Sequence, residues 1–73
     1  MSPALPVVSG AETVKALNRA GFIQAGQRGS HVKLRHADGR TVIVPLHSEL
    51  ARGTLRSVLR QAGMSTGQFL EFL

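Results

Sequence analysis

The hydrophobic pattern changes its period along this chain, and that change limits the folds the chain can adopt. Between residues 30 and 36 apolar and basic residues alternate, so Val32 and Leu34 face one side of a strand and their neighbours the other. An Asp-Gly turn follows, and then a β-branched run over 41–46, which Pro45 restricts to a sheet edge or ends. The sequence therefore predicts a hairpin with one apolar and one basic face.

Helical spacing replaces this alternation upstream of the hairpin. Ser9 and Glu12 have the spacing of a capping box, which predicts a helix over about 10–20, and Gly21 can adopt the left-handed conformation that ends it. The short β-prone segment 22–27, bounded by glycines, predicts a further strand. The helix is expected to turn one apolar side inward: Val14, Leu17 and Ala20.

Helical spacing returns after the hairpin. Apolar residues over 53–62 predict an amphipathic helix that ends at Gly63, and Ser65 with Gln68 repeats the capping-box spacing for a short final helix over 65–73. The expected inward stripe of the longer helix is Leu55, Val58, Leu59 and Ala62.

The resulting order of elements specifies the architecture. It predicts an α+β fold, a small two-layer α-β-β-β-α sandwich with a three-stranded antiparallel sheet and a short extra C-terminal helix. The two amphipathic helices must cover the apolar face of the sheet from the same side. We expect residues 1–6 to form a flexible tail and residues 7–73 a single domain, because a chain of 73 residues buries too little surface for two cores.

The composition indicates the cellular compartment of the protein. The chain has no cysteine, which excludes disulfides and thiolate metal sites. No apolar run approaches the roughly 20 residues that span a bilayer, and the N-terminus lacks the basic and apolar regions of a secretory signal. The expectation is a soluble cytoplasmic protein without a membrane partner.

The charge balance indicates the class of partner. Nine Lys and Arg against four Asp and Glu give a net charge of +5, which favours polyanions. On the predicted sheet, His31, Lys33 and Arg35 emerge on the exposed face, close to where Arg28 and Gly29 enter the strand. Because no aromatic residue is expected there, contacts to backbone phosphates are favoured over base stacking.

The histidines raise three chemical alternatives. His31, His36 and His47 lack a recognisable metal-ligand spacing, and Ser30 with His31 is a weak nucleophile pair because strand neighbours point to opposite faces; Ser30 is expected to pack inward or bond the local backbone. RNA, in contrast, carries its own nucleophile, so one imidazole can move the proton of a 2′-hydroxyl or of the leaving 5′-oxygen. A solvent-facing strand histidine without a catalytic role is the alternative for His31.

Several blocks together resemble a known family. "AGF" ending at Phe22, "QRGSH" at 27–31, "DGR" at 38–40, "VPLH" at 44–47 and "GTLRSVLRQAG" at 53–63 are similar in order and spacing to the HicA toxins. The similarity runs from about residue 6 to the C-terminus.

This resemblance implies a fold like that of double-stranded-RNA-binding domains and an mRNA interferase activity that a HicB-type antitoxin neutralises. The catalytic histidine of the family lies in its "GSH" block, which is His31 here, and no metal or cofactor is implied. "GTL" at 53–55 is interpreted as the start of a helix. The RNA contacts expected around the histidine are Arg28, Gly29, Ser30, Lys33, Arg35, Arg40 and His47.

Two readings remain beside the endoribonuclease. The same basic face would serve a noncatalytic RNA-binding module, and an inactive toxin could act chiefly as a regulatory partner of its antitoxin in a transcriptional complex. The expected protein partner is an acidic or partly acidic antitoxin that covers the face around His31, since it must compete with RNA for the same cations.

Overall fold

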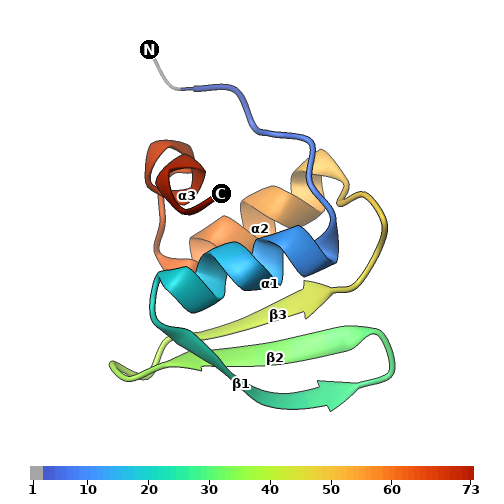
Figure 1. Ribbon diagram of the computed structural model, residues 1–73, viewed down its shortest axis with the longest axis vertical. Coiled ribbons are helices and arrows are strands. Elements are labelled where there is room, and N and C mark those ends of the chain that lie inside the picture. Colours follow the sequence, from blue (N-terminus) through green and yellow to red (C-terminus); the bar gives the residue numbers. More distant parts are fainter. Residues whose placement is uncertain (1–2) are drawn as a thin grey trace.

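The computed structural model describes residues 3–73 and has the predicted order of elements (Figure 1). Three helices and a three-stranded antiparallel sheet form a small α+β domain. The elements are α1 (Gly10–Arg19), β1 (Phe22–Arg28), β2 (His31–His36), β3 (Thr41–Pro45), α2 (Arg52–Ala62) and α3 (Thr66–Phe72).

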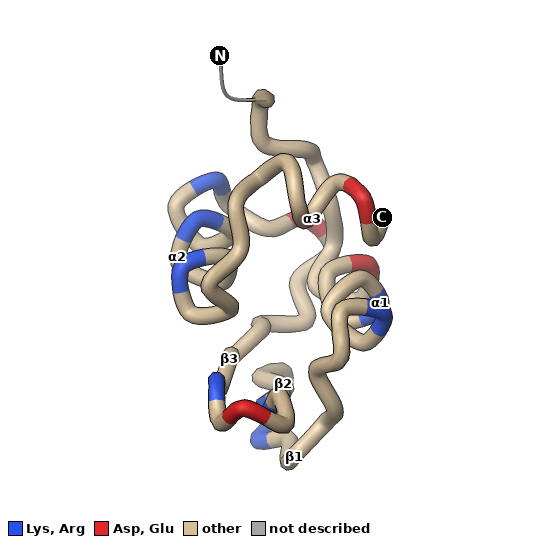
Figure 2. Tube along the Cα trace, turned by 90° about the vertical axis from the view of Figure 1, so that its left-hand side faces the viewer, with Lys and Arg blue, Asp and Glu red and all other residues tan. Residues whose placement is uncertain are grey.

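The sheet is a meander of order β1-β2-β3, and the helices lie on one of its faces (Figure 1). Figure 2, turned by 90°, separates the layer of α1 and α2 from the sheet. Within residues 3–73 no element covers the opposite face of the sheet. The predicted two-layer arrangement is therefore confirmed, and the described residues leave one face of the sheet uncovered.

Both predicted capping boxes are present. Ser9 Oγ accepts from Glu12 N–H at 3.0 Å, and the Glu12 carboxylate accepts from Ser9 N–H at 2.8 Å. Ser65 and Gln68 repeat this reciprocal pair at the start of α3. These local bonds satisfy amides that a helix start otherwise leaves without partners, which is why the sequence located both starts within one residue.

The core lies between the sheet and the helices. Val32 and Leu34 of β2 are buried, as their alternation predicted, and the predicted inward stripe of α2 is buried along its whole length. Phe22 and Phe69 are the largest fully buried side chains. α3 thus contributes a full aromatic ring to a core that contains no tryptophan.

The inward side of α1 differs from the prediction. Thr13, Ala16 and Leu17 are buried, whereas Val14 and Ala20 are only partly buried. Thr13 can enter the core because its hydroxyl donates to the Ser9 carbonyl oxygen at 2.9 Å, which satisfies the polar group within the helix. Small residues on this side let α1 approach the sheet closely.

The predicted tail covers residues 1–6, of which residues 1 and 2 lie outside the described residues. Residues 3–9 contain no helix or strand. Leu5 packs partly against the core, and the Val8 carbonyl accepts from Leu50 N–H at 2.9 Å. Within residues 3–73 no helix has the length and apolar character to cross a membrane.

Candidate nucleic-acid interface

A two-residue turn places His31 at the start of β2. Arg28 and His31 face each other across the hairpin, with Gly29 and Ser30 between them. Gly29 has φ 56°, a conformation that residues with a Cβ atom rarely adopt, and a two-residue hairpin needs a positive φ at this position. Ser30 is exposed, so the expectation that it packs inward is wrong. It belongs to the turn and not to β2, so strand alternation does not determine its direction.

Register defines the face of the sheet that the helices leave open, which we call the outer face. On β2 it carries His31, Lys33 and Arg35, and their antiparallel partners on β1 and β3 share it, except Pro45, the buried partner of His31 on β3. The pairing of β2 with β3 is regular, whereas the pairing of β1 with β2 contains a bulge between Gln24 and Gly26. The outer face comprises Ile23, Gly26, Arg28, His31, Lys33, Arg35, Thr41 and Ile43.

The outer face is cationic. Arg28, His31 and Arg35 are exposed and Lys33 is half-buried, as the alternating pattern predicted. The four carboxylates of the chain belong to α1, the β2–β3 turn, the loop after β3, and α3, so none shares this face. A phosphate group placed on this face would therefore meet positive side chains without a competing carboxylate on the same face.

The sequence analysis missed the apolar members of the outer face. Ile23 is 73% exposed and Ile43 is 39% exposed. Ile43 could have been placed from its alternation with the buried Val42 and Val44. Ile23 could not, because it stands beside Phe22 in a pair of consecutive apolar residues, and the pairing of β1 with β2 decides which of the two faces outward.

His47 lies at the same end of the sheet as His31. Leu46 N–H donates to the Ser30 carbonyl oxygen at 2.6 Å, which joins the end of β3 to the β1–β2 turn. Gly10 N–H donates to the His47 carbonyl oxygen at 2.9 Å, so the start of α1 fixes the backbone of His47. The exposed His47 side chain follows directly from this anchored segment.

Arg40 lies at the opposite end of β2, about 16 Å along the strand from His31. Its Nε donates to the Asp38 carboxylate at 2.9 Å, its Nη1 donates to the Ala62 carbonyl oxygen, and its Cζ lies 5.1 Å from the Phe22 ring centroid. The hydrogen bonds from Arg40 hold the pKa of Asp38 at about 2, below its usual value. The structure thus does not bring Arg40 together with His31.

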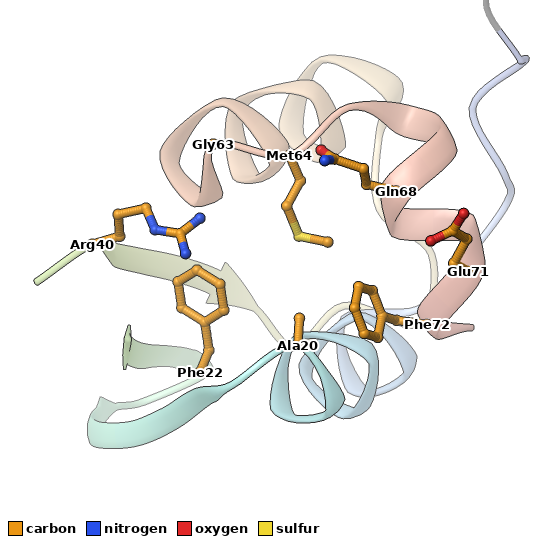
Figure 3. A pocket seen from close by; sticks show the side chains of 8 residues that line it. All are labelled: Ala20, Phe22, Arg40, Gly63, Met64, Gln68, Glu71 and Phe72. Carbon is orange, nitrogen blue, oxygen red and sulfur yellow. The ribbon is translucent and has the colours of Figure 1, made fainter. Parts of the chain in front are cut away.

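The guanidinium of Arg40 instead borders a hollow of about 270 Å³ beside α3 (Figure 3). Apart from Arg40, the expected RNA-binding residues do not line this hollow. Its lining residues are Ala20, Phe22, Arg40, Gly63, Met64, Gln68, Glu71 and Phe72.

His36 has a packing role at this far end of the sheet. Its ring meets Phe22 edge-on with centroids 5.1 Å apart, and its Nδ1 accepts from Asp38 N–H at 3.2 Å. Among residues 3–73, His, Asp and Glu side chains form no group of three that could hold a metal ion. His31 and His47 thus lie at one end of the sheet, and His36 lies at the other.

Comparison with known proteins places this geometry in context. Residues 10–64 match the model of a family described as the HicA toxin of bacterial toxin-antitoxin systems. A solved structure, described as a toxin-antitoxin complex from Streptococcus pneumoniae, contains a chain with 36% identity and a TM-score of 0.68; the match covers 78% of this chain and 98% of that one. Curated protein sequences gave no match. The family match spans the whole outer face and ends before α3.

Proposed function

This chain belongs to the HicA toxin family of toxin-antitoxin systems, and from that premise we propose that it is a metal-independent endoribonuclease that cleaves messenger RNA and so inhibits translation. One observation carries the proposal: His31 is exposed on the outer face, between Arg28 and Lys33, at the end of a tight hairpin. The substrate is one that the protein would meet in the cytoplasm.

The proposed reaction uses the 2′-hydroxyl of the RNA as nucleophile. His31 removes its proton, the 2′-oxygen attacks the adjacent phosphorus, and the bond from phosphorus to the 5′-oxygen breaks. The leaving 5′-oxygen takes up a proton, giving a 2′,3′-cyclic phosphate and a free 5′-hydroxyl. Histidine suits either proton transfer because imidazole titrates near neutral pH.

Neighbouring cations supply the electrostatic part of the reaction. Arg28 is the cross-strand partner of His31, and Lys33 and Arg35 follow on the same side of β2. They would hold the phosphates and stabilise the charge that develops on the reacting phosphoryl group. Gly29 and Ser30 leave the turn open for a bulky substrate, and His47 is proposed as a second contact from the same end of the sheet.

The proposed protein partner is a HicB-type antitoxin that covers the outer face. Support comes from the solved relative, which is a toxin-antitoxin complex, and from the chemistry of the face itself. A partner with acidic side chains complements the cations, and its apolar side chains can bury Ile23 and Ile43. Such a complex would block access of RNA to His31.

Cleavage of a defined transcript in the presence of a chelator tests the activity. We expect the parent to produce cyclic phosphate ends and His31→Ala to cut at least about 100-fold more slowly. Lys15→Ala, which removes an exposed cation on α1 in the helical layer, is the matched control and should cut as the parent does. A requirement for a divalent ion, or full activity of His31→Ala, would refute the mechanism.

A noncatalytic RNA-binding module is the second candidate, because a cationic face is sufficient for retention of RNA without turnover. It predicts tight, salt-dependent binding of the transcript by the parent with no new fragment ends. Growth arrest on induction that disappears with His31→Ala would decide for the enzyme.

A further inference from the structure

A hollow in the outer face includes His31 in its lining, and the reaction described above leaves the space itself without a role. It has a volume of about 450 Å³ and reaches across all three strands. Its lining residues are Gly26, Gln27, Arg28, His31, Lys33 and Ile43.

Gly26 opens this hollow. The bulge between Gln24 and Gly26 resets the register so that Gly26, Lys33 and Ile43 form one row across the sheet. The other two members of the row have long side chains, whereas Gly26 has none. A Cβ atom added at Gly26 would meet nothing within 4 Å, so the space above its backbone is empty of protein.

The lining matches the parts of a nucleotide. Ile43 is an apolar wall that can contact a ribose or base, and the bare backbone at Gly26 allows a flat group to approach closely. Arg28 and Lys33 flank the hollow with positive charge for the phosphates on either side. His31 at the rim then lies where the linking phosphate must pass.

We propose that this hollow is the subsite that seats the nucleoside next to the scissile phosphate and thereby aligns the RNA strand with His31. The inference rests on the proposed ribonuclease function. A protein that covers the outer face can block access to His31 without filling the space above Gly26, whereas any strand cut by His31 must cross that space. The observations therefore favour RNA over antitoxin as the occupant.

Filling the hollow tests the proposal. Gly26 does not have a positive φ and has free space around it, so Gly26→Leu should fold, which circular dichroism and a thermal melt would verify. Gly53→Leu is the matched control, since Gly53 on α2 has the same freedom and lies in the other layer. On a short defined oligonucleotide we expect Gly26→Leu to lose at least about tenfold in kcat/KM and Gly53→Leu to match the parent.

Different outcomes separate this inference from the proposed function. If the parent cuts RNA and folded Gly26→Leu cuts it equally well, the hollow is not a subsite although the enzyme stands. If Gly26→Leu loses antitoxin binding and retains cleavage, the hollow belongs to the protein partner and the inference is wrong.

If the parent cuts no RNA, the ribonuclease proposal fails. A nucleotide-binding measurement then tests whether the hollow is a nucleotide subsite. The probe is then a 2′-deoxy dinucleotide added to isotope-labelled protein. Amide shifts at Gly26, Lys33 and Ile43 that disappear in Gly26→Leu would support a nucleotide subsite, and absence of shifts in the parent would overturn it.

Discussion

Gly10→Ala should destabilise the fold although alanine is the better helix former. Gly10 is the first residue of α1, and helix propensity alone predicts a gain of up to about 1 kcal/mol for this change. The structure predicts the opposite sign. A Cβ atom here would overlap the Pro45 carbonyl oxygen and lie 2.8 Å from Leu46 Cα, where ordinary contact begins at 3.4 Å.

The size of the effect follows from what must move. These contacts are backbone atoms, so no side chain can turn away, and α1 must withdraw from the end of β3. Overpacking of this kind costs about 1–3 kcal/mol, and lengthening the hydrogen bond from Gly10 N–H to the His47 carbonyl costs about 1 kcal/mol more. After the propensity gain, the net loss is about 1–3 kcal/mol, which in a domain of this size lowers the Tm by roughly 5–20 °C.

Gly53→Ala is the matched control for this experiment. Gly53 is also in the first turn of a helix, but a Cβ atom there would meet nothing within 4 Å. Its melting temperature should stay the same or rise by a few degrees. Thermal unfolding followed by circular dichroism compares the two variants with the parent, and a Gly10→Ala protein as stable as Gly53→Ala would refute the reasoning.

Four further predictions use the same protein. Because Arg40 lowers the pKa of Asp38 to about 2, the ionised carboxyl stabilises the fold above its unfolded pKa and this contribution is lost as pH falls from about 4 to 2; urea midpoints of Asp38→Asn should decline less over that range. Phe69→Ala should cost about 3–5 kcal/mol in urea unfolding, since its ring is fully buried. Arg40→Ala should lower the Tm and leave RNA retention unchanged, because Arg40 bonds Asp38 and Ala62. Arg35→Ala should leave the Tm unchanged and reduce RNA retention. Equal losses of RNA binding in the two variants would place Arg40 in the interface. Ile23→Thr should weaken antitoxin binding about tenfold in titration calorimetry without slowing RNA cleavage, and unchanged affinity would move the apolar contact elsewhere.

Much of this fold could be predicted from the sequence because its determinants are local. Alternation of apolar and basic residues in β2 fixed which side chains face the core, since strand geometry points neighbours to opposite sides. Both capping boxes act within four residues of chain, so the starts of α1 and α3 followed from residue types alone. The exposed position of His31 among cations belongs to this group.

Tertiary structure alone decided how those elements meet. The bulge in β1 depends on pairing with β2, and it determines that Gly26 opens the outer face beside His31. Arg40 follows the Asp38-Gly39 turn in the sequence, yet packing of α2 against the sheet brings the Ala62 carbonyl to its guanidinium, at the opposite end of the sheet from His31. Burial of Thr13 and the close approach at Gly10 likewise require the helix and sheet to be in contact. Local patterns specify which way a side chain points, whereas its neighbours depend on contacts between segments far apart in the chain.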